Sequence, residues 1–127
     1  THVFQQNTHQ LLFKQMNDAV NAFVTDMKNN NRFDDVLLFT FSEFGRRVEQ
    51  NASGGTDHGT ANSMFLISGG LKQKGLINAL PDLSDLDEGD LKYRIDFKQV
   101  YATMLNKWLD ADDKSVLEKQ YNYLSFI

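Results

Sequence analysis

The sequence predicts an α/β fold in which helices pack on a mainly parallel sheet. Apolar residues recur every three or four positions between Thr8 and Met27, which is the period of an amphipathic helix. Two short apolar runs follow at residues 36–41 and 63–68, and such runs are typical of strands that are buried on both faces. A helix, a strand, a long loop and a second strand in this order indicate the α/β class.

Local signals predict where the helices begin and end. The cluster Asn29–Asn31 should stop the first helix, because asparagine competes for backbone hydrogen bonds and tolerates left-handed conformations. Asp96 is placed to cap a helix over residues 97–108. Asp110 or Asp112 is placed to cap a last short helix.

The composition is that of a soluble globular chain. Its 127 residues are 41% hydrophobic, and 13 basic and 17 acidic side chains give a net charge of −4. This length suits one segment, residues 1–127, that is a domain or the end of a larger one. We expect no nucleic-acid partner, because no sustained basic face is present. We also expect no membrane span and no export signal within the chain, because no apolar run is long enough.

The groups that can carry chemistry gather between the two apolar runs. Asp57 and His58 adjoin in a glycine-flanked loop, and Glu43 stands at the carboxyl end of the first expected strand, where α/β proteins place their sites. The chain has no cysteine, so a metal would be held by imidazole and oxygen ligands, which these three residues offer. The alternative is structural: Asp57 caps a turn, His58 bonds the loop backbone, and Glu43 pairs with an arginine.

Two arginines, Arg46 and Arg47, follow Glu43 closely. Guanidinium groups are planar and bind phosphate or sulfate through paired hydrogen bonds, which makes anion binding one expectation. Ion pairs with Glu43, Glu49 or Asp57 are the other.

The remaining polar residues receive structural roles. Ser53 and Thr56 have no evident base beyond the neighbouring histidine, so we expect them to bond the loop rather than act as nucleophiles. His2 and His9 are expected to be exposed tail or helix residues. The stretch 81–90 is expected to be a surface loop, because five of its ten residues are acidic. We do not expect it to bind calcium, because Gly89 and Asp90 fall where a calcium loop needs an oxygen ligand and the turn glycine.

Several segments carry a family resemblance beyond these local patterns. They are residues 37–47, 51–62 around Gly-Thr-Asp-His-Gly, 64–70, 81–83, 89–91 and 96–102. In them the chain resembles the DUF1501 family, which is similar to sulfatases and alkaline phosphatases and commonly carries a twin-arginine export signal. The resemblance implies the C-terminal portion of a larger periplasmic or extracytoplasmic protein with an alkaline-phosphatase-like three-layer sandwich.

The resemblance also implies chemistry. In the phosphatases and sulfatases of this superfamily the first strand often ends in Ser-Asp-His-Gly, and Ser42-Glu43-Phe44-Gly45 stands in that place here. Glu43 can coordinate a metal, but Phe44 cannot. Asp57-His58-Gly59 looks like the later histidine motif, which makes His58 the leading site residue. The nucleophile would lie in an N-terminal remainder of the protein, so this chain alone is expected to be inactive.

Three function classes follow. The first is an exported hydrolase of phosphate or sulfate esters, with Glu43, Asp57 and His58 at a divalent metal (zinc, manganese, calcium or magnesium) and Arg46 and Arg47 at the anion. The second is an exported binding or assembly module that keeps the fold without the metal. The third is a small independent α/β domain. As a fragment, the chain is expected to expose apolar surface and to self-associate.

Overall fold

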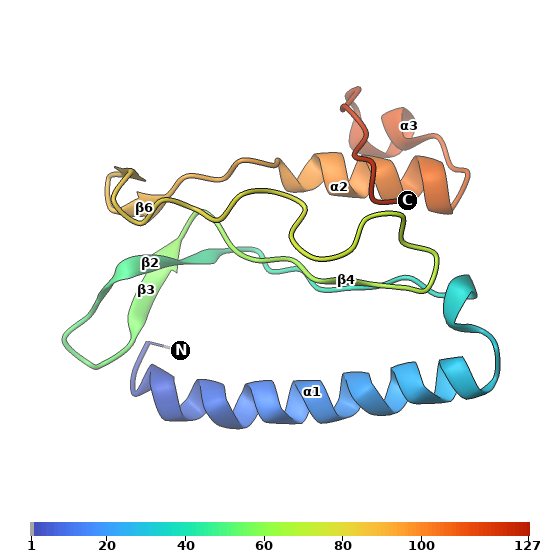
Figure 1. Ribbon diagram of the computed structural model, residues 1–127. Coiled ribbons are helices and arrows are strands. Elements are labelled where there is room, and N and C mark those ends of the chain that lie inside the picture. The colour runs from blue at the N-terminus through green and yellow to red at the C-terminus, as the bar shows by residue number, and fades with distance from the viewer. Residues whose placement is uncertain (1) are drawn as a thin grey trace. The chain divides into compact units, whose positions relative to one another are not determined.

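The computed structural model describes residues 2–127, which form two compact units. The first unit comprises the residues up to Gly69 together with Pro81–Lys92, and the second comprises Gly70–Leu80 together with Tyr93–Ile127. Both helices and small sheets are present, so the predicted mixture of α and β structure is confirmed (Figure 1). None of the helices in residues 2–127 is long and apolar enough to cross a membrane.

The first unit begins with a long helix, α1 (Gln5–Asn29), which contains the predicted helix and extends it at both ends. The asparagine stop is confirmed, because the backbone and side-chain amides of Asn30 both donate to the carbonyl of Asp26. Asn31 then takes a left-handed conformation with φ of 54°. A 3₁₀ turn, η1 (Phe33–Asp35), follows.

The two predicted apolar strands pair with each other, but both are short. The pair consists of β1 (Leu38–Phe39) and β4 (Leu66–Ile67). They run antiparallel, and all strand pairs in residues 2–127 are antiparallel in sheets of two strands. The expected mainly parallel sheet is therefore not found in the described residues. The prediction that both apolar runs are buried on both faces is also wrong, since Phe39 and Phe65 are exposed.

The physical reason for the antiparallel pairing lies in the connection between the strands. A parallel pair needs a crossover of a dozen or more residues, usually a helix. Here the connecting segment folds instead into a hairpin of β2 (Gly45–Gln50) and β3 (Thr56–Gly59), with Arg46 opposite His58 and an irregular register between Arg46 and Gln50 (Figure 1). A hairpin returns the chain beside its incoming strand, and the returning strand is then antiparallel.

The acidic stretch forms a second small hairpin. It consists of β5 (Leu86–Asp87) and β6 (Asp90–Leu91). Glu88 and Gly89 turn the chain, and both have positive φ angles, 49° and 90°. Positive φ at both central residues is the mark of a tight two-residue hairpin turn. The expected surface loop thus has a defined hairpin at its end.

The second unit is helical. It contains α2 (Phe97–Thr103), which continues into a π-helical turn, η2 (Met104–Trp108), and then α3 (Asp113–Leu117). The predicted cap at Asp96 is confirmed by a reciprocal pair of side-chain to backbone hydrogen bonds with the first turn of α2. Of the two candidate caps for the last helix, Asp112 is the one that caps α3.

Candidate functional site

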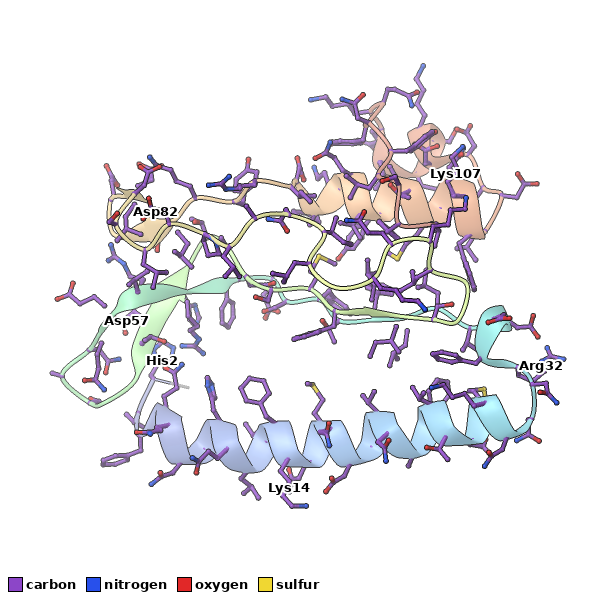
Figure 2. The ribbon with its side chains drawn as sticks, viewed as in Figure 1. His2, Lys14, Arg32, Asp57, Asp82 and Lys107 are labelled. Atoms are coloured by element: carbon purple, nitrogen blue, oxygen red, sulfur yellow. The ribbon has the colours of Figure 1, made fainter. Side chains whose placement is uncertain are left out.

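The strand β3 presents Asp57 and His58 at the surface of the first unit, and the start of the chain folds back to meet them. Val3 forms an antiparallel bridge with Gly54, and the backbone N–H of Phe4 donates to the carbonyl of Ser53 at 3.1 Å. These backbone bonds hold His2 beside β3, and Figure 2 shows His2 and Asp57 as neighbours at this hairpin.

His2 joins the two predicted site residues. Its Nδ1 lies 3.4 Å from Oδ1 of Asp57, and its Nε2 lies 3.1 Å from Nε2 of His58. The three side chains therefore form a chain of carboxylate, imidazole and imidazole. The cluster is open to solvent, because the side chains of His2 and Asp57 are 54% and 62% exposed.

Asn51 holds this cluster together from the turn of the hairpin. Its Nδ2 donates to Oδ1 of Asp57 at 3.1 Å and to the carbonyl of His2 at 2.9 Å. Its own Oδ1 accepts the backbone N–H groups of Ser53 and Gly55, both at 3.0 Å, which fixes the side chain. The hydrogen bonds from Asn51 and His2 lower the pKa of the Asp57 carboxyl. Asp57 is therefore an anion at neutral pH.

Phe44 packs against the ring face of His58. The two ring centroids are 3.6 Å apart and the rings are inclined by 14°, which is a stacked arrangement. The guanidinium of Arg46 lies 5.3 Å from the centroid of Phe44, and its Nη1 donates to the carbonyl of Thr56 at 2.7 Å. Stacking fixes the plane of His58 and leaves its edge, with Nε2, toward His2.

Arg47 has partners that the sequence did not suggest. Its Nη2 donates to the carbonyl of Glu88, and its Nε lies 3.6 Å from Oδ1 of Asp90. Both partners belong to the β5–β6 hairpin. Arg47 thus joins this hairpin to β2, and only its remaining N–H groups are available for an anion.

The three expected metal ligands are not gathered into one group. Glu43 is exposed in the bend that precedes β2. Among residues 2–127, no three or more His, Asp or Glu side chains are arranged to hold a metal ion. Glu43, Asp57 and His58 therefore do not form a three-ligand group within these residues. His58 is instead paired with His2, with their Nε2 atoms 3.1 Å apart.

Comparison with known protein families places these residues in a family. The model of the family described as "protein of unknown function (DUF1501)" matches residues 1–121. The chain belongs to the DUF1501 family. No curated protein and no solved structure matches it. His2, Asn51, Asp57 and His58 all lie within the matched residues, so the cluster is part of the DUF1501 domain.

Sequence reasoning found two members of this DUF1501 cluster and missed the others. Asp57 and His58 stood out because they adjoin among glycines. His2 was expected to be an exposed tail residue; it is exposed, but it also bonds to residues 55 and 56 positions away. The available signal for Asn51 was its place shortly before two glycines, which is a turn signature. The backbone groups of Val3 and Phe4 can pair with such a turn, as they do with Gly54 and Ser53.

Proposed function

We propose that this chain is the C-terminal part of an exported hydrolase of phosphate or sulfate esters. The observation that supports the proposal is the chain of Asp57, His2 and His58 on an exposed strand. A carboxylate that bonds one nitrogen of an imidazole fixes its tautomer and orientation, and this arrangement recurs in acid–base catalysis and in metal centres. The resemblance to sulfatases and alkaline phosphatases supports the ester class, the three-layer sandwich in the intact protein and its extracytoplasmic location.

In this proposal His58 exchanges a proton with the ester or its leaving group. Asp57 acts through His2 and is a positioning residue, because its Oδ1 faces Nδ1 of His2 rather than His58. Arg46 binds the anionic group through the N–H groups that do not bond Thr56, since a guanidinium has five donors. A divalent metal, where bound, would polarise the ester. The nucleophile comes from the remainder of the protein.

Hydrolysis of p-nitrophenyl phosphate and p-nitrophenyl sulfate by the intact protein tests the proposal. We expect turnover of one ester, and we expect His58→Ala to lower it by about 100-fold or more, the scale of one general acid–base group. The matched control is His9→Ala, which removes a histidine from α1. No turnover of either ester by the wild type, or equal turnover by His58→Ala and the wild type, would overturn the proposal.

A second candidate is a binding module without metal chemistry, and the stacking of Phe44 on His58 favours it. Phe44 stands where the superfamily often has a metal ligand, and here it stacks on His58 and makes a cation–π contact with the guanidinium of Arg46. A surface that combines aromatic rings with guanidinium donors suits contacts with the rings and hydroxyl groups of a glycan. A glycan array probed with the intact protein in EDTA tests this: binding that Phe44→Ala abolishes supports the module, and metal-dependent hydrolysis contradicts it.

A further inference from the structure

We infer that His2 and His58 form a two-imidazole site for a transition-metal ion of the zinc, nickel or copper class. This site is distinct from the expected set of Glu43, Asp57 and His58, because it takes a ligand from the start of the chain and leaves Asp57 outside the metal's reach. It does not depend on the proposed hydrolysis. Imidazole is the protein ligand that these ions share.

The distance between the two ring nitrogens carries the inference. Nε2 of His2 and Nε2 of His58 are 3.1 Å apart. Two imidazole nitrogens that bind one zinc ion tetrahedrally, each at about 2.0–2.1 Å, lie about 3.3 Å apart. The observed pair therefore needs an adjustment of only a few tenths of an ångström to take a metal ion between the two nitrogens. Without the metal, the same two atoms are close enough to share a proton.

Asp57 supplies the outer support that such a site requires. Its Oδ1 faces Nδ1 of His2, which is the nitrogen opposite the one that faces His58. A hydrogen bond from Nδ1–H to the carboxylate leaves the lone pair of His2 on Nε2, where the metal would bind. Nδ2 of Asn51 donates to the same Oδ1 at 3.1 Å and holds the carboxylate in this position.

The second imidazole is held in place by a different contact. Phe44 covers one ring face of His58 at 3.6 Å, so the ring cannot turn freely, but its nitrogen edge stays open. The ring of His2 lies 4.8 Å from that of His58 and is tilted by 40°, so the two imidazoles are not stacked face to face. Two nitrogen ligands and an exposed position leave the other coordination positions to water or to a ligand. The two-ligand set also accounts for the lack of a three-residue metal group within residues 2–127.

Calorimetric titration of the full chain with Zn²⁺, after treatment with EDTA and its removal, tests the site. We expect one Zn²⁺ per chain. His2→Ala and His58→Ala should each weaken binding by at least about 10-fold, and Asp57→Asn should weaken it by about 10-fold, the lower end for an outer-shell partner. His9→Ala is the matched control and should bind as the wild type does. Far-UV circular dichroism confirms that these surface variants keep the fold.

The two single histidine variants separate this site from simpler explanations. Binding that survives in His58→Ala would mean that His2 binds metal with its local backbone alone, and the inference would fail. Binding that survives in His2→Ala would also overturn it. With Cu²⁺ as the probe, electron paramagnetic resonance should show two equivalent imidazole nitrogens, and a single nitrogen would contradict the site. Hydrolysis is not used as a readout, so failure here leaves the proposed function standing, and the converse also holds.

Discussion

The two units of the chain are stabilised in different ways. In the second unit, side chains are buried: all four buried hydrophobic residues of residues 2–127 lie there, namely Val100, Ala102, Met104 and Phe126. In the first unit, none of the 25 residues of α1 is buried. The order of the first unit comes from backbone pairs and polar contacts, such as those of Asn51 and Arg47.

This difference shows that the candidate site lies in the part of the chain with the smaller apolar core. Large apolar side chains such as Leu11, Phe13 and Phe41 are exposed in the first unit. Exposed apolar surface of this kind marks an interaction face or an aggregation risk, and self-association of the isolated chain stays a prediction. The cluster around His2 keeps its geometry through hydrogen bonds rather than through burial, since the side chains of His2 and Asp57 are exposed.

The largest effect should come from the buried aromatic residue of the second unit. Phe126 is fully buried, and Phe126→Ala should lower the free energy of unfolding by about 3–5 kcal/mol through lost burial and a cavity. Phe41→Ala is the matched control in the first unit: Phe41 is 72% exposed, and its loss should change stability by less than about 0.5 kcal/mol. Urea unfolding measures both. Equal decreases in the free energy of unfolding for the two variants would contradict the difference between the units.

A smaller effect should follow removal of the cap of α2. Asp96 accepts the N–H of Lys98, and the side chain of Gln99 accepts the N–H of Asp96. Asp96→Ala should cost about 1 kcal/mol of unfolding free energy, because a helix N–H loses its partner. Asp96→Asn should keep most of that stability, since asparagine caps about as well. Urea unfolding of the three proteins checks this, and an equal loss in both variants would show that charge, not capping, matters.

The smallest effect concerns pH. The hydroxyl of Tyr123 donates to Oδ1 of Asp113 at 2.8 Å, and this hydrogen bond, with burial, raises the pKa of Tyr123 above the usual value of about 10. The bond therefore contributes stability that is fully present below pH of about 10 and is lost as pH rises through the raised pKa. Melting temperatures measured between pH 8 and 11 should fall more steeply for the wild type than for Tyr123→Phe. If melting temperature fell with pH equally in the two proteins, the Tyr123–Asp113 hydrogen bond would not contribute to the pH dependence of stability.

Local features of the fold were predictable, and partnerships were not. The caps at Asp96 and Asp112 and the stop at Asn30 depend on residues a few positions apart, so their chemistry is visible in the sequence. The predicted strands 36–41 and 63–68 each contain an observed strand, β1 and β4, but the apolar runs did not fix the direction in which these strands pair. The β2–β3 hairpin was missed because its strands are polar and lack an apolar alternation.

The sequence by itself determined the helices, their caps and the adjacency of Asp57 and His58. Only the tertiary structure decided that His2 meets them, because that contact depends on closure of a loop of more than 50 residues. The bonds that close it run between backbone groups near Val3 and Gly54, and backbone groups are the same for nearly every residue type. The pattern of side chains in the sequence therefore does not predict the contact of His2 with Asp57 and His58, although the chemistry of the cluster depends on that contact.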